Sequence, residues 1–216
     1  MTLKLMEKLR KSAEEESARI KTNPEIWQKV QPTFFANLEI GRSLEQASNF
    51  IFDPIGLILM HPLKTEEYES TPRNSSAFAR TGGDGVHFSL LHLDGQIIEK
   101  SPVVMTVPDN YGEENLIVGS SLYEFLCLGS RTGYFLLEGL TYSDRRKETL
   151  EYLEHPEALV KEDSQVLNKE NIKRSQYLLQ LLRDSLSLHP WRNIENRLSE
   201  LQSFQKLLDL PSKERK

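Results

Sequence analysis

Apolar residues in the first fifty positions recur at the spacing of a helix. Leu5, Leu9 and Ala13 follow one another every four residues among charged side chains, which predicts an amphipathic helix. Ser43 is followed three residues later by Gln46, a spacing that fits a capping box at the start of a further short helix. We therefore expect the chain to open with a helical segment.

The pattern changes over residues 54–142, where short apolar runs alternate with turn-forming residues. Runs of this length, rich in β-branched and aromatic residues, are typical of buried strands. The five candidate strands are residues 55–61, 76–82, 86–93, 101–109 and 132–140. Because few helices separate them, the predicted fold class is α+β. It has a mainly antiparallel or mixed sheet of about five strands backed by helices, with helical N- and C-terminal segments.

One helix is predicted inside this strand-rich zone. Ser121 stands three residues before Glu124, which indicates a capping box, and Gly129 is placed to end the helix. Leu122 and Phe125 form an apolar face that we expect to pack on the sheet.

The remaining residues return to helical spacing. Two amphipathic stretches, 172–189 and 193–210, meet at Pro190, which predicts an αα-hairpin. We assign residues 1–142 to an α+β domain with N-terminal helices. Residues 143–216 form a C-terminal helical extension packed on the same domain, and a partner-binding arm is the alternative.

Charge and composition narrow the classes of partner. Hydrophobic residues make up 38% of the 216 residues, and the formal net charge is −5. With no long run of Lys or Arg, nucleic acid is not an expected partner, and an acidic surface favours a basic protein. No apolar run approaches the roughly 20 residues that cross a bilayer, and no secretory h-region stands at the start, so we expect a cytoplasmic protein without a membrane partner. Cys127, the single cysteine, is expected to be a buried thiol.

The segment "TGGDGVHF", residues 81–88, is the strongest candidate for local chemistry. A P-loop needs Lys and Ser or Thr after its last glycine, but Val86 and His87 follow Gly85. A dinucleotide fingerprint needs a third glycine and a following helix. Gly and Asp here instead suit a tight hairpin turn. We predict a structural turn, which in the alternative also presents Asp84 or His87 to a partner.

Other catalytic patterns are missing from the sequence. The five histidines show no H-E-x-x-H spacing, and no G-x-S-x-G elbow occurs. We therefore expect neither a catalytic constellation nor a metal site, and no cofactor.

The order of segments after residue 77 resembles the second half of proteins of the SUKH superfamily. A strand beginning Phe-Ala, a Gly/Asp-rich turn, a Pro-Val-Val strand and a helix of the Ser-x-x-x-Phe-Leu type follow one another over about 55 residues. The matching residues are Phe78, Ala79, Gly82, Asp84, Gly85, Pro102, Val103, Val104, Ser121, Phe125 and Leu126. As a divergent relative, the chain would have a sheet backed by helices and a non-enzymatic role. The resemblance implies an immunity-type protein that neutralises a toxin domain, often a nuclease, or a signalling scaffold.

Our leading hypothesis is a cytoplasmic protein-binding domain that occludes the surface of a basic toxin or nuclease domain. Its predicted partner-binding residues are Asp109, Tyr111, Glu113, Glu114, Asp84 and His87. Tyr111 would act as the aromatic anchor within the acidic segment "PDNYGEEN".

Two alternatives stay open. A scaffold protein could form a homodimer through the C-terminal stripe, which consists of Leu198, Leu201, Phe204 and Leu208. An enzyme could have an unrecognised site near Asp84 and His87, which would require a deep pocket with convergent polar groups.

Overall fold

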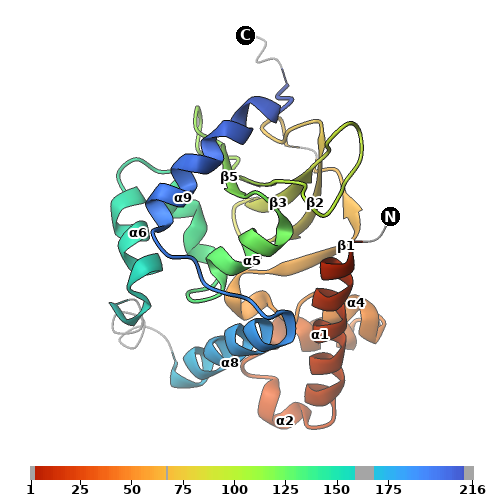
Figure 1. Cartoon of the computed structure of the whole chain (residues 1–216). Helices are drawn as coiled ribbons and strands as arrows, with labels where there is room; N and C mark the ends of the chain where they lie inside the picture. The colour runs from red at the N-terminus through yellow and green to blue at the C-terminus, as the bar shows by residue number, and fades with distance from the viewer. Residues whose placement is uncertain (1–2, 67, 159–167, 212–216) are drawn as a thin grey trace.

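Five strands of the computed structural model form one antiparallel sheet (Figure 1). The structure describes residues 3–66, 68–158 and 168–211. Each strand pairs with the next one along the chain, in the order β1-β2-β3-β4-β5. The strands are β1 (Ile58–Lys64), β2 (Ser75–Arg80), β3 (His87–Leu91), β4 (Val103–Thr106) and β5 (Asn115–Gly119). The α+β class and the antiparallel sheet are therefore confirmed.

The fifth strand is not the predicted one. Residues 132–140, expected as a strand, contain the 3₁₀-helix η2 (Phe135–Leu140). Its buried Leu137 and Leu140 lie three residues apart, while Phe135 and Glu138 face outward at the same spacing, which is the period of a 3₁₀-helix. The place of the missing strand is taken by β5, whose Ile117 and Val118 are buried on opposite faces of the sheet.

The first face of the sheet carries the main core. Phe88 and Leu90 of β3 point to this face, where helix α5 (Leu122–Gly129) covers them. The ring of Phe125 lies 4.7 Å from that of Phe88 and 5.4 Å from that of Phe78. As predicted, Ser121 caps the helix by accepting a hydrogen bond from the Glu124 amide. The capped helix thus places its apolar side directly on the strands.

The second face is covered by the C-terminal segment. Leu91, Val104 and Ile117 form a separate apolar cluster with Leu201 of α9 (Ile194–Leu201). Phe204 of η3 (Gln202–Leu207) and Leu208 pack against it. The stripe expected to form a dimer is therefore used within the chain. The prediction that this stripe is a free dimer surface is wrong, because Leu198 and Leu201 are fully buried in the fold.

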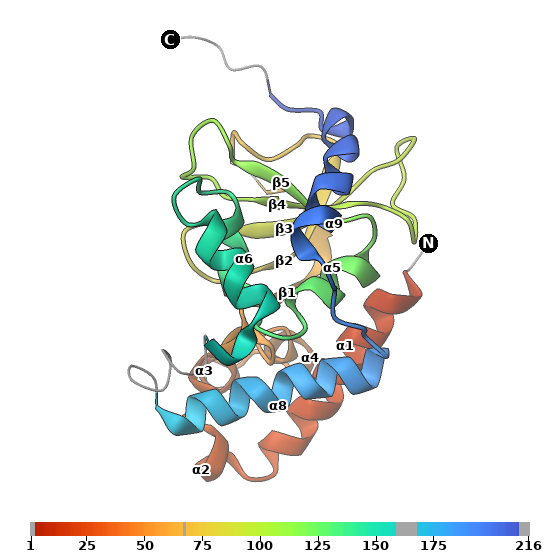
Figure 2. The same cartoon turned by 60° about the vertical axis from the view of Figure 1, so that its left-hand side comes forward.

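The remaining helices lie in two places: α1, α2, α3, α4, η1 and α8 gather beyond the β1 end of the sheet, while α6 lies against η2 and α9 (Figure 2). Their bounds are α1 (Lys4–Lys21), α2 (Pro24–Trp27), α3 (Pro32–Glu39), α4 (Leu44–Ser48), η1 (Asp53–Ile55), α6 (Arg146–Glu154) and α8 (Lys169–Leu186). The predicted capping box joins Ser43 and Gln46 at the start of α4. None of the helices in the described ranges is long and apolar enough to cross a membrane.

The predicted αα-hairpin of the C-terminal zone does not form. Both views show α8 crossing α1, on which it packs, while α9 lies against β5 of the sheet (Figures 1 and 2). Ser187 ends α8 in the left-handed conformation, and buried Leu188 then leads the chain away. The apolar side of α8 is buried against α1, and that of α9 is buried against the sheet. The two helices therefore do not pack against each other as a hairpin.

A buried ionic cluster joins α1 to α8. Glu16 accepts hydrogen bonds from Arg19, from Tyr177 and from the Arg174 Nη1, which lies 2.5 Å from Oε1. The side chains of Glu16 and Arg174 are only 2% and 1% exposed. The Arg174 guanidinium also lies 4.9 Å from the centre of the Trp27 ring. This cluster fixes the position of α8 through directional contacts that an apolar stripe alone does not provide.

Candidate functional site

The glycine-rich segment is the turn of the β2–β3 hairpin, as predicted. The Thr81 amide donates to the Val86 carbonyl at 3.1 Å, and the Val86 amide donates to the Gly83 carbonyl at 3.1 Å. Asp84 and Gly85 have φ values of 48° and 70°, in the left-handed region that Gly and Asp tolerate best. Asp84 is exposed at the tip of this turn.

His87 is buried and stabilises the turn through a hydrogen bond to its backbone. Its Nδ1 lies 2.8 Å from the Gly85 carbonyl, which can only accept, so Nδ1 carries the proton. Nε2 therefore accepts from the Thr71 hydroxyl at 3.1 Å. Burial lowers the pKa of His87, which favours this neutral form. The predicted exposure of His87 to a partner is wrong, because the residue is only 1% exposed.

The connection between β1 and β2 buries His87 by crossing the second face of the sheet. Tyr68 stacks on the imidazole with ring centres 5.6 Å apart. Further along, the Ser70 carbonyl accepts a hydrogen bond from the Asn115 side chain at 2.8 Å. The Asn74 side chain donates to the Leu207 carbonyl, also at 2.8 Å. The connection thus ties β1 and β2 to β5 and the C-terminal segment.

The acidic segment between β4 and β5 is a well-anchored loop. The Val107 amide donates to the Glu114 carbonyl at 2.7 Å, and the Glu113 amide donates to the Asn110 carbonyl at 3.1 Å. The Asn110 side chain donates to the carbonyls of Glu113 and Thr141, and the second bond ties the loop to the chain after η2. On this fixed backbone Tyr111 is 88% exposed.

Carboxylates from separate elements gather beside this loop. Burial and the charge of Asp84 raise the pKa of Glu138 in η2, against the opposing charge of Arg145. Burial and the charges of Glu138, Asp109 and Asp84 likewise raise the pKa of Tyr142. The Arg145 guanidinium stacks on the Tyr142 ring at 5.3 Å. Asp84, Asp109 and Glu138 therefore lie near one phenol.

We call this surface the acidic face and define it by six residues. They are Asp84, Asp109, Tyr111, Glu113, Glu138 and Tyr142. Its four carboxylates come from the β2–β3 turn, the β4–β5 loop and η2, and Arg145, stacked on Tyr142, supplies one positive charge beside them. The predicted residue Glu114 is half-buried and lines a neighbouring hollow of about 490 Å³ along the edge of β5.

Sequence reasoning missed Glu138 and Tyr142, because it assigned residues 132–140 to a strand. The available signal was a single carboxylate inside the apolar run "YFLLEGL". Glu138 follows Phe135 by three residues, and this spacing places both on the outer side of a 3₁₀-helix.

Within the described ranges, no group of three or more His, Cys, Asp or Glu side chains could hold a metal ion. Cys127 is buried, and burial raises the pKa of its thiol.

Comparison with protein-family models, with curated proteins and with solved structures finds no match to this chain.

Proposed function

We propose that this chain is a non-enzymatic protein-binding domain that covers a basic surface of its partner with the acidic face. The observation that carries the proposal is the exposed ring of Tyr111, held on an anchored loop beside carboxylates from three elements. The resemblance to the SUKH superfamily supplies the finer proposal. The chain would be a cytoplasmic immunity-type protein, and the partner a toxin domain such as a nuclease.

The physical properties of the face suit this role. Clustered carboxylates attract a basic partner during encounter and disfavour acidic ones. An exposed tyrosine supplies a large contact area that loses little conformational freedom. Because the Asn110 side chain already ties the loop to the Thr141 carbonyl, binding has a small ordering cost.

Affinity capture from the native host's lysate at low salt tests the proposal. The bait is the full chain, compared with an Asp109→Lys/Glu113→Lys variant. The control is Glu7→Lys/Glu25→Lys, which makes the same change of charge at exposed positions on α1 and α2. We expect a basic protein to be recovered with the wild type and the control and lost with the acidic-face variant. Recovery of the same proteins by all three baits would contradict the proposal.

Glu138 makes the binding sensitive to pH. Since its folded pKa is raised above the ordinary 4.5, it takes up a proton before an ordinary carboxylate as the pH falls. The face then loses one negative charge, and we expect affinity for a basic partner to fall about fivefold, or about 1 kcal/mol. In Glu138→Gln this part of the pH dependence is absent at every pH. Titration calorimetry between pH 7 and pH 5 measures both profiles, and identical profiles would exclude Glu138 from the interface.

A further inference from the structure

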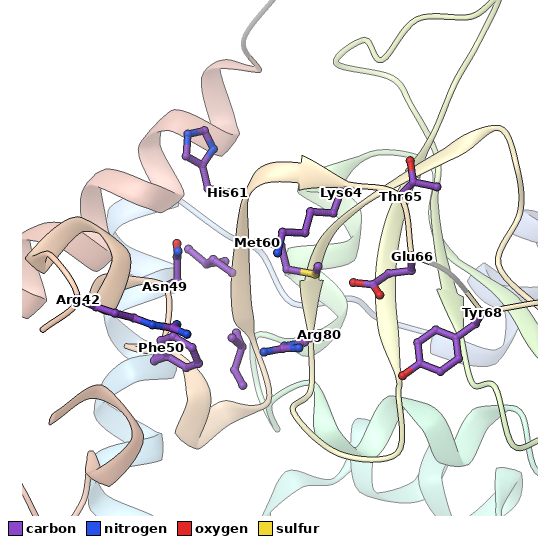
Figure 3. Close-up of a pocket in the computed structure, with 12 residues that line it drawn as sticks. Arg42, Asn49, Phe50, Met60, His61, Lys64, Thr65, Glu66, Tyr68 and Arg80 are labelled. Atoms are coloured by element: carbon purple, nitrogen blue, oxygen red, sulfur yellow. The ribbon is translucent and has the colours of Figure 1, made fainter. Parts of the chain in front are cut away.

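A second hollow extends across edge strand β1, with a volume of about 520 Å³ (Figure 3). Ile58 and Leu59 of β1 form its buried floor. Phe50, which follows α4, and Tyr68 of the β1–β2 connection line it from opposite sides. Its volume is in the range of sites that take small molecules.

Positive charge is concentrated in this hollow. Arg42, Lys64 and Arg80 come from the α3–α4 turn, β1 and β2. Among the described residues of the lining, Glu66 is the one carboxylate, so these charged groups carry a net +2, in contrast to the −5 of the whole chain. Figure 3 shows the guanidinium groups of Arg42 and Arg80 pointing toward one another across β1.

None of these three cations is neutralised by an ion pair with a described residue, a condition they share with most lysines and arginines in the described ranges. Among the described residues, no carboxylate lies within 4.0 Å of the charged groups of Arg42, Lys64 or Arg80. By contrast, Arg10, Arg19, Arg174 and Arg197 all pair with glutamates. Like charges that converge without a counter-charge repel one another, and an anion between them removes that repulsion.

Parts of the hollow are held in place by the surrounding fold. Arg80 lies opposite His87 and Ile58 in the sheet register. Tyr68 is stacked on His87, and a Cβ added to Gly85 would lie 2.6 Å from its hydroxyl. The Arg42 guanidinium lies 5.8 Å from the centre of the Phe50 ring. The ring of Tyr68 and the backbone of Arg80 are therefore fixed, while the side chains of Arg42, Lys64 and Arg80 are exposed to a ligand that enters from solvent.

The edge of β1 is poorly suited to pairing with another strand. The outward Leu59 amide already donates to the Asn49 carbonyl at 2.9 Å. The pairing with β2 is then interrupted between Leu59 and Lys64, and Pro62 has no amide proton. A ligand at this hollow would therefore be recognised by the side chains and not by pairing of a strand with the β1 backbone.

We propose that the hollow binds a small organic phosphate that carries two or more phosphate charges. The planar guanidinium groups of Arg42 and Arg80 donate paired hydrogen bonds to phosphate oxygens, and Lys64 adds a third positive charge. Together they match a diphosphate or triphosphate group better than a single carboxylate. Phe50 and Tyr68 provide the apolar contact for the organic part.

Titration calorimetry of the full chain with pyrophosphate and with ATP, both without metal, tests this proposal. We expect both probes to bind and ATP to bind more tightly, because only ATP can use the aromatic walls. Arg42→Ala and Arg80→Ala should each weaken binding by about tenfold or more. Arg80→Lys should lie between Arg80→Ala and the wild type, because it keeps the charge and loses the planar fork.

Two matched controls make the result specific. Arg192→Ala removes an exposed arginine from the α8–α9 connection, and Asp109→Lys/Glu113→Lys alters only the acidic face. Both should bind pyrophosphate as the wild type does. The proposal is overturned if neither probe binds, if the Arg42 and Arg80 variants bind normally, or if an oligoglutamate peptide binds and pyrophosphate does not.

Discussion

Replacing Arg174 by Met should lower the free energy of unfolding by about 3–5 kcal/mol, the largest stability change expected for this chain. The substitution leaves the Glu16 carboxylate buried and without its shortest hydrogen bond. Arg19 still pairs with Glu16 and Tyr177 still donates to it, but both are partly exposed, and the buried positive charge between α1 and α8 is lost. Urea unfolding followed by Trp fluorescence measures the loss, since Trp27 lies against the cluster.

A double variant separates the missing ion pair from a general packing defect. Glu16→Leu/Arg174→Met removes both charges, and it should regain most of the lost stability. Arg197→Met is the matched control. It breaks a pair with Glu124 in which both side chains are partly exposed, so about 0–1 kcal/mol is expected. Equal losses in the two single variants would show that burial of the Glu16 pair has no special importance.

The same cluster should make stability depend on acid. Burial raises the pKa of Glu16, but the hydrogen bonds and charges of Arg19 and Arg174 outweigh it, and the net pKa is below the ordinary 4.5. A carboxylate with a lowered pKa stabilises the fold above its unfolded pKa, and it loses that contribution as the pH falls through the folded value. The stability difference between the wild type and Glu16→Leu/Arg174→Met should therefore shift in favour of the double variant below pH 4.5.

Replacing Tyr111 by Ala should weaken binding of the captured partner by about 2 kcal/mol or more, which is about thirtyfold. Tyrosine is, with tryptophan and arginine, one of the residue types that most often dominate a protein interface. Its 88% exposure also means that the substitution should change the free energy of unfolding by less than about 0.5 kcal/mol. Titration calorimetry with the purified partner, together with urea unfolding of the free chain, measures both quantities.

Ile40→Ala is the control for Tyr111→Ala. Ile40 is 72% exposed after α3, in the helical layer and away from the acidic face. Its removal should leave the affinity unchanged. Tyr111→Phe should retain most of the affinity if the ring makes the contact, and it should lose as much as Tyr111→Ala if the hydroxyl does.

The sheet could be predicted because its signals are local. In β3, apolar Phe88 and Leu90 alternate with His87 and Ser89, and this period of two is visible without knowledge of any other strand. The cap at Ser121 also depends on neighbours only three residues away. The strand predicted at residues 132–140 was wrong because a continuous apolar run does not distinguish a strand from a buried 3₁₀-helix.

What a buried surface packs against could not be predicted in the same way. The stripe through Leu198 and Leu201 showed correctly that one side of a helix is buried, but a second copy and the chain's own sheet are equally suitable partners for it. The alternation along β3 puts His87 on the face opposite Phe88 and Leu90, which left it open to a partner in the prediction. That side is in fact closed by the β1–β2 connection and the C-terminal segment, which lie far away in sequence.

Part of the acidic face could be predicted from the sequence and part of it could not. Asp109, Tyr111 and Glu113 could be found because they share one turn-rich loop. The contribution of Glu138 depends on a tertiary contact, the hydrogen bond from the Asn110 side chain to the Thr141 carbonyl, for which the sequence has no pattern.

The most direct test of the protein-binding account is the dissociation constant of the purified chain and its captured partner at two salt concentrations. For the wild type and for Glu7→Lys/Glu25→Lys, we expect tight binding that weakens as salt screens the contact. For Asp109→Lys/Glu113→Lys, affinity at low salt should fall by about tenfold or more, and most of the salt dependence should disappear. An unchanged dissociation constant and an unchanged salt dependence in that variant would show that the acidic face is not where the partner binds.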